Sequence, residues 1–170
     1  MLPDHVPFLD RLFARLEARP GTLDHLFLDH LCYRTETVAD YEQLRDALAA
    51  KHTLLVESLI GGRRIASFRL ATPLSYCARS IPLVELPEPK AGSFYATGWE
   101  HAELVTDGPL PAFTERLPAL LAVGPEAFDR RGLTKARNAD LRVKLGNGMS
   151  VKFHERSLAE VIAEELDAAR

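Results

Sequence analysis

The chain has 170 residues and a mass of 18.9 kDa, with 46% hydrophobic and 26% charged residues. This composition is typical of a globular domain and excludes a disordered, collagen-like or coiled-coil chain. The formal charge of −3 excludes a global positive field that would attract nucleic acid or an anionic membrane. No apolar run reaches the roughly 18 residues that a membrane helix needs, and the first residues lack the features of a signal peptide.

Two cysteines, Cys32 and Cys77, are too few for a disulfide framework, so we expect a cytoplasmic protein. Basic residues gather within residues 130–137, but no aromatic residues alternate with them. We therefore interpret this run as a solvated loop and predict no nucleic-acid partner.

The predicted elements begin with an amphipathic helix in residues 1–21, where apolar residues recur at three- and four-residue spacing. Residues 22–90 then predict a strand, a helix and three strands. These elements lie at about 29–35, 38–49, 53–60, 63–70 and 80–86. Thr37 caps the helix, and Gly61-Gly62 supplies the positive φ angles of a two-residue hairpin turn.

Residues 91–156 repeat this order of elements. They predict a strand, a helix, a weak strand and two further strands, at about 100–106, 110–121, 127–131, 140–145 and 149–155. Pro118 interrupts the helix, and Asn147-Gly148 joins the last two strands in a tight turn. Ser157-Leu158-Ala159-Glu160 is a capping box that opens a final helix in residues 157–170.

The repeat is visible in the residues as well as in the order of elements. Asp29-His30-Leu31 recurs as Glu100-His101-Ala102, and residues 66–70 recur as residues 139–143. The sequence therefore predicts one α+β domain over residues 1–170. Its two modules each have the order βαβββ and form a cupped mixed sheet, flanked by the N- and C-terminal helices.

Two histidines occupy equivalent positions of the modules. Side chains alternate across a strand, so His30 shares a face with Cys32 and Arg34, and His101 shares a face with Glu103. The opposite faces are largely aliphatic and suit packing beneath helices. We expect both histidines to point into the concave interior, and we interpret Cys32 as a packing residue.

A carboxylate follows each histidine at nearly the same spacing, Glu85 after His30 and Glu155 after His101. Imidazole and carboxylate together suit Zn, Fe, Ni, Co or Mn, so the pairs indicate a divalent-metal site. Two alternatives stay open. Glu85 also fits a solvated strand end, and Glu155 also fits a charge at the start of the last helix.

Glu103 and His154 are the other candidates near the predicted ligands. Glu103 lies two residues from His101 on the same face, where it can bind the metal or act as the catalytic base; we assign it the base role. His154 faces away from the site if its strand is regular, so we expect a structural role.

Arg34, Arg69 and Arg142 occupy positions on the same concave face. Three guanidinium groups around a metal favour an anionic, oxygen-rich small molecule, for which a carboxylate is the natural choice. The alternative is that each arginine pairs with a nearby acid.

Five segments carry a family resemblance, at residues 28–34, 60–63, 84–87, 98–103 and 151–158. Through them the sequence resembles the YecM family of bacterial proteins, and its order of elements resembles the vicinal oxygen chelate superfamily. The resemblance implies a cup with a divalent metal held by His30, Glu85, His101 and Glu155. The family pattern has no fixed acid after Lys-Phe-His, which makes Glu103 a competitor of Glu155.

Two functions remain open. The first is a metal-dependent enzyme of the isomerase, lyase or dioxygenase type, in which the cation chelates a small organic acid and Glu103 moves the proton. The second is a non-catalytic protein that binds or sequesters a small molecule in the same cup. Both modules lie in one chain, so the site needs no second subunit.

Overall fold

The computed structural model describes residues 1–94, 96–168 and 170, which form four α-helices, three short 3-10 helices and an eight-stranded sheet. The α-helices are α1 (Val6–Leu16), α2 (Val38–Ala49), α3 (Leu110–Arg116) and α4 (Leu158–Ala168). The 3-10 helices are η1 (Leu117–Leu120), η2 (Pro125–Ala127) and η3 (Arg131–Thr134). The strands are β1 (Phe27–Arg34), β2 (Thr53–Ile60), β3 (Arg63–Tyr76), β4 (Arg79–Pro87), β5 (Gly98–Val105), β6 (Phe128–Asp129), β7 (Asp140–Gly146) and β8 (Met149–His154).

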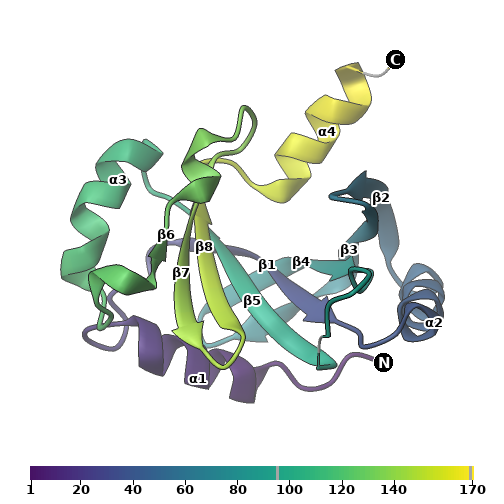
Figure 1. The fold of residues 1–170 in the computed structure, drawn as a ribbon, viewed down its shortest axis with the longest axis horizontal. Helices are drawn as coiled ribbons and strands as arrows, with labels where there is room; N and C mark the ends of the chain where they lie inside the picture. Colours follow the sequence, from purple (N-terminus) through teal and green to yellow (C-terminus); the bar gives the residue numbers. More distant parts are fainter. Residues whose placement is uncertain (95, 169) are drawn as a thin grey trace.

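The strand order is β2-β3-β4-β1-β5-β8-β7-β6 (Figure 1). The central strands β1 and β5 are antiparallel, whereas β1 pairs with β4, and β5 with β8, in parallel. Each half of the sheet is therefore one module, and the two halves are joined through their first strands. This arrangement confirms the predicted α+β fold with two βαβββ modules in one mixed sheet.

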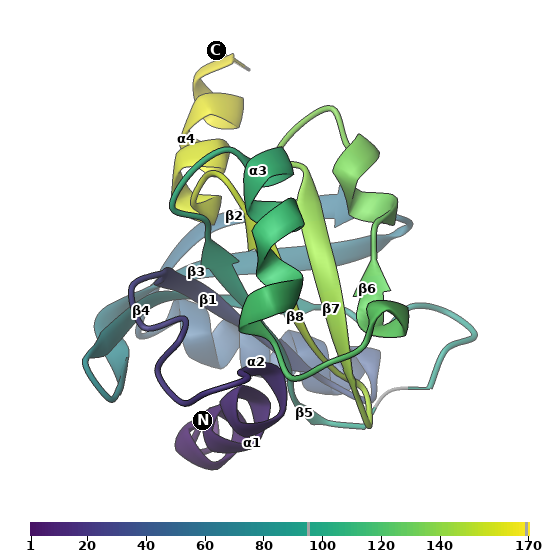
Figure 2. The ribbon, with the colours of Figure 1, turned by 90° about the vertical axis from the view of Figure 1, so that its left-hand side faces the viewer.

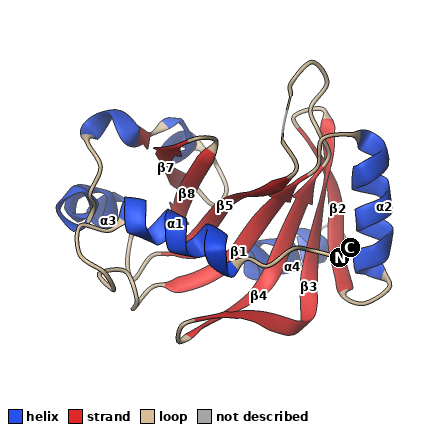
Figure 3. Ribbon diagram, turned by 90° about the horizontal axis from the view of Figure 1, so that it is seen from below, coloured by secondary structure: helices blue, strands red, loops and turns tan. Residues whose placement is uncertain are grey.

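The helices bury the apolar face of the sheet. Figure 3 shows α1 across the strands on the underside, with α2 at the β2 end and α3 at the opposite end. From the side of α3, Figure 2 shows this helix over β7 and β8. Phe113 of α3 packs on Phe153 of β8, with ring centroids 5.3 Å apart. A second apolar cluster lies beneath α2, around Tyr41 and Phe68. The other face of the sheet is the cup, and the predicted site residues His30, Glu85 and Glu103 lie there.

Local sequence explains most of the element boundaries. The Thr37 side chain accepts a hydrogen bond from the Asp40 N–H at the start of α2, and Gly61 and Gly62 both have positive φ, as predicted. The helix predicted for 110–121 ends at Arg116 and continues as a 3-10 turn with Pro118 near its start. The weak strand is only two residues long, and β3 extends beyond the predicted residue 70 to Tyr76.

Residue 95, in the predicted second module, and residue 169, in the predicted C-terminal helix, lie outside the described residues. None of the described helices combines the length and apolar character needed to cross a membrane.

Candidate metal centre

Each histidine of the repeat lies beside a β-bulge. The β1–β5 register has one extra residue on β1 at Asp29 and one extra residue on β5 at Glu100. Each bulged acid directly precedes a histidine, His30 or His101. A bulge interrupts the alternation of side chains, so the acid and the histidine turn to the same side. The repeated acid-His pair thus forms two equivalent corners of one site.

His30, Glu85, His101 and Glu103 form what we call the donor cluster. Each offers one donor atom, and all four atoms lie within 4.8 Å of one another. The Oε1 atom of Glu103 lies 3.4 Å from His30 Nε2 and 3.1 Å from His101 Nε2. Glu85 Oε2 lies 3.9 Å from His101 Nε2. Both histidines are 2% exposed, so the cluster lies at the buried floor of the cup.

The Nδ1 atoms of two imidazoles are held by partners outside the donor cluster. His30 Nδ1 lies 2.9 Å from Asp29 Oδ2, and His154 Nδ1 donates to the carbonyl of Arg156 at 2.6 Å. These contacts leave the Nε2 atoms of His30 and His154 facing the carboxylate of Glu103. Among the described residues neither atom has a hydrogen-bond partner. A buried nitrogen in this position suits a cation, and an acid that orients a ligating histidine through Nδ1 is a recurrent feature of metal sites.

The histidines of the donor cluster differ in protonation. Burial opposes a proton on His30, but Glu103 and Asp29 outweigh burial and raise the pKa of His30 to about 10. Burial, followed by the charge of Lys152, lowers the pKa of His101 to about 4. Burial would raise the pKa of Glu103, yet Lys152 and His30 hold it well below its usual range. The cluster therefore pairs an ionised carboxylate with a neutral His101.

Strand β8 corrects two predictions. In the parallel β5–β8 register Lys152 is opposite Glu103, so Lys152 and His154 face the cup while Phe153 faces the core. His154 Nε2 lies 3.4 Å from Glu103 Oε2, and the expectation that His154 faces away is wrong. The strand ends at His154, so Glu155 does not continue its alternation. The exposed Glu155 accepts a hydrogen bond from the Leu110 N–H at the start of α3, away from the donor cluster.

The three predicted arginines have different surroundings. Arg34 is buried and binds Glu100, so it belongs to a local ion pair, which is the alternative left open by the sequence. Arg69 is exposed on β3 and lines none of the cavities described below. Arg142 lies opposite Lys152 in the β7–β8 register and is half-buried on the cup face.

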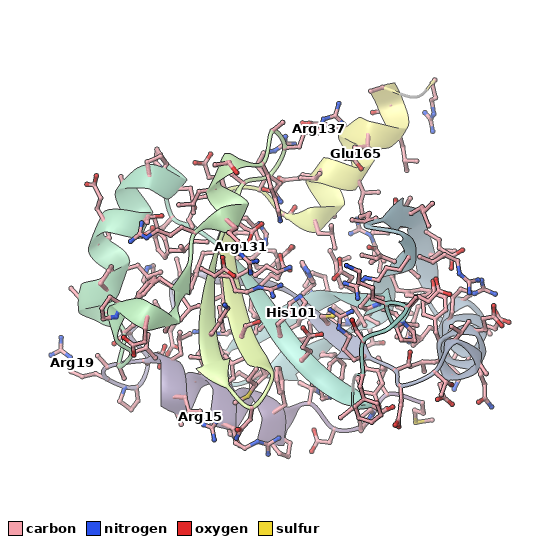
Figure 4. The ribbon with its side chains drawn as sticks, in the orientation of Figure 1. Arg15, Arg19, His101, Arg131, Arg137 and Glu165 are labelled. Carbon is pink, nitrogen blue, oxygen red and sulfur yellow. The ribbon has the colours of Figure 1, made fainter. Side chains whose placement is uncertain are left out.

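A cavity of about 230 Å³, the cup cavity, lies above the donor cluster. Its floor includes His30, Glu103 and His154, and its walls come from the β2–β3 hairpin, the loop before β7 and α4. Figure 4 shows His101 over the sheet, with Arg137 and Glu165 at the rim. These two side chains join the loop to α4 with a 3.5 Å ion pair.

The residues present fit a divalent cation. The donor atoms are imidazole nitrogens and carboxylate oxygens, which suit Zn, Fe, Ni, Co or Mn. Once His30 gives up its proton, as a metal ligand must, four carboxylates around the cluster (Asp29, Glu85, Glu100 and Glu103) exceed the two cations Arg34 and Lys152 by two charges. A divalent ion would balance this excess.

The chain is similar to a described protein family, to a curated relative and to solved structures. The family described as "YecM protein" matches residues 1–165. Protein YecM of Escherichia coli (strain K12) is 31% identical over 98% of this chain and 92% of its own length. The solved structure described as "Structural Genomics, Protein EC4020" is 31% identical, with a TM-score of 0.75 over 96% of this chain and 88% of that chain. A Streptomyces coelicolor methylmalonyl-CoA epimerase reaches a TM-score of 0.49 at 12% identity, over 76% of this chain and 96% of that chain.

Proposed function

We propose that the cup of this chain, which belongs to the YecM family, binds a divalent metal ion. A small oxygen-rich molecule would bind beside the ion. His30, Glu85, His101 and Glu103 are the proposed protein ligands. The observation that carries the proposal is the convergence of these four donors, from both modules, on one buried point. Glu103 thereby takes the ligand position that the sequence predicted for Glu155.

The remaining residues of the floor orient the ligands and handle protons. Asp29 fixes the ring of His30 through Nδ1, and the Arg156 carbonyl fixes the ring of His154. Burial lowers the pKa of His154, so its Nε2 is an unprotonated base next to Glu103. When bound, the metal would polarise a carbonyl or stabilise an enolate, which is chemistry shared by isomerases, lyases and dioxygenases.

Lys152 supports a second candidate function. Its ammonium group contacts Glu103 and is mostly buried, so the lysine itself supplies a positive charge inside the cluster. A protein that uses Lys152 in place of a metal would bind its small molecule without catalysis. Among the described residues, the Lys152–Glu103 pair is the specific feature that favours this candidate.

Elemental analysis of natively purified protein distinguishes the two candidates. We expect about one equivalent of a divalent metal per chain, lost in His30→Ala and in His101→Ala but kept in His25→Ala. His25 is exposed and lies outside the donor cluster, which makes it the matched control. Metal-free wild-type protein that also takes up no Zn(II), Ni(II), Co(II), Mn(II) or Fe(II) would rule out the metal centre and favour the binder.

A further inference from the structure

A second hollow, lined by residues of β6, η3, β7 and β8, lies beside the cup cavity. It has a volume of about 320 Å³ and shares Lys135, Asp140 and Lys152 with the cup cavity. We call it the basic hollow; its other lining residues are Asp129, Arg131, Gly132 and Arg142. The shared residues make the two spaces neighbours over the same sheet.

The basic hollow has more positive than negative charge. Four basic side chains line it, against two acidic ones. Asp129 pairs with Arg131, Asp140 pairs with Lys135, and Lys152 contacts Glu103. Arg142, in contrast, has no carboxylate within ion-pair distance among the described residues. Its guanidinium is therefore available to an anion from solution.

A row of cross-strand neighbours connects Arg142 to the donor cluster. Arg142 is opposite Lys152, Lys152 is opposite Glu103, and Glu103 is opposite His30. Adjacent strands lie about 4.8 Å apart, so Arg142 is about two strand spacings, or roughly 10 Å, from Glu103. An anion bound by Arg142 thus lies within the length of a small molecule from the cluster.

The far side of the cup cavity is largely aliphatic. Two groups of apolar side chains line it, one from the β2–β3 hairpin (Val56, Ile60 and Ile65) and one from α4 (Leu158, Val161 and Ile162). Ser58, Ser67 and Glu165 of the same elements add polar groups between them. Small-molecule sites commonly combine such an apolar wall with a few placed polar groups. The cup therefore has an apolar end and a cationic end, with the donor cluster between them.

We propose that Arg142 binds the carboxylate of an aliphatic organic acid whose hydrocarbon part lies between the β2–β3 hairpin and α4. Guanidinium pairs with a carboxylate through two parallel hydrogen bonds, and the aliphatic side chains favour a hydrocarbon tail over a second charged end. The placement of this acid across the donor cluster rests on the proposed metal function. The binding of its carboxylate by Arg142 is independent of the metal function.

The repeat supplies a matched control for Arg142. Arg69 is the equivalent residue of the first module, and among the described residues it too has no carboxylate within ion-pair distance. It lines neither the cup cavity nor the basic hollow. Arg142→Ala and Arg69→Ala therefore remove the same charge from the same sheet face, but only the first removes the proposed anion receptor.

Calorimetry on the metal-free full chain tests the proposal with butanoate, hexanoate, hexanol and inorganic phosphate as probes. We expect hexanoate to bind more tightly than butanoate and hexanol to bind far more weakly. Arg142→Ala should weaken hexanoate binding by about 10- to 100-fold, the contribution of hydrogen bonds to a charged group. Arg142→Lys should give an intermediate loss, and Arg69→Ala no loss.

Three results would overturn the proposal: equal losses in the two alanine variants, hexanol binding as tightly as hexanoate, or phosphate binding with no binding of hexanoate. Repeating the titrations with Zn(II) separates this proposal from the metal function. Zn(II) uptake without Arg142-dependent hexanoate binding removes the acid site alone. Arg142-dependent binding in a chain that takes up no metal removes the metal centre alone.

Discussion

Glu103 and Lys152 lie directly opposite each other on the parallel strands β5 and β8, and their side chains form an ion pair at the floor of the cup. Both side chains are at most 15% exposed. Water compensates only in part for a largely buried carboxylate that loses its partner cation, which is why such pairs are costly to break. The pair therefore stabilises the protein, and it also occupies one carboxylate of the proposed metal site.

Lys152→Met should lower the free energy of unfolding of the metal-free protein by up to about 3–5 kcal/mol, because it removes one of the two cations beside the buried Glu103 and leaves only His30. Added Zn(II) should recover part of this loss, because the ion replaces the missing charge. Thermal unfolding with and without Zn(II) measures both effects. Lys144→Met, at an exposed lysine on β7, is the control. Equal melting temperatures in the two variants would contradict this role of Lys152.

Glu103→Gln should reduce Zn(II) affinity by more than 100-fold, since it removes the carboxylate nearest both histidines. Glu155→Gln should leave the affinity unchanged, because Glu155 contacts the Leu110 N–H instead of the donor cluster. Calorimetric titration of each purified variant with Zn(II) gives the comparison. Loss of affinity in Glu155→Gln alone would restore the ligand assignment made from the repeat.

Asp29→Asn should weaken metal binding by about 10- to 100-fold without removing a ligand. The Oδ2 atom of Asp29 lies 2.9 Å from His30 Nδ1 and accepts the Leu158 N–H, also at 2.9 Å. An amide at this position orients His30 less firmly and makes Nε2 a poorer donor. Asp24→Asn, at an exposed aspartate, is the control for the same titration with Zn(II). Equal affinities in the two variants would show that Asp29 does not position His30.

The two histidines of the donor cluster should limit the stability of the metal-free protein at opposite ends of the pH range. The raised pKa of His30, about 10, adds stability that is complete below its ordinary value of 6.5 and is lost as the pH rises toward 10. The lowered pKa of His101, about 4, adds stability that is complete above 6.5 and is lost as the pH falls toward 4. Imidazole ¹⁵N spectra across pH 4–10 identify each titration. Two curves that coincide near 6.5 would contradict the electrostatics of the cup.

One thiol per chain should react with an aromatic disulfide reagent in the native protein, and two should react after denaturation. Cys32 is fully buried on β1, and burial raises the pKa of its thiol. Cys77 is exposed in the turn between β3 and β4. Absorbance of the released thiolate counts the reactive groups. Two fast-reacting thiols in the folded state would show that β1 opens.

The sequence predicts the architecture of this chain better than the details of its site. Local signals such as Gly61-Gly62 and Asn147-Gly148 locate the hairpins, and the repeat of the two modules reveals the sheet. Simple alternation also brings His30 and His101 together, as the structure confirms. These features depend on short-range patterns that a single strand carries in its own residues.

The errors come from register, which is set between strands far apart in the chain. Alternation alone does not reveal that β8 ends at His154 or that Lys152 faces Glu103, because the β5–β8 pairing decides both. Nor does it reveal the bulges at Asp29 and Glu100. The sequence does contain one sign of these bulges, because an acid directly precedes the histidine in both copies of the repeat.

The hydrogen bond from the Leu158 N–H to Asp29 joins residues 129 positions apart. On a translating ribosome, His30 emerges long before the segment that supports its acid partner, and His101 and His154 also follow at intervals. An emerging chain thus carries Asp29 and His30 before the N–H group from which Asp29 accepts a hydrogen bond, so this corner of the cup takes its final form only after Leu158 has been synthesised. The candidate metal site is therefore among the last parts of the fold to be completed, because the segments that arrange it are spread from β1 to the start of α4.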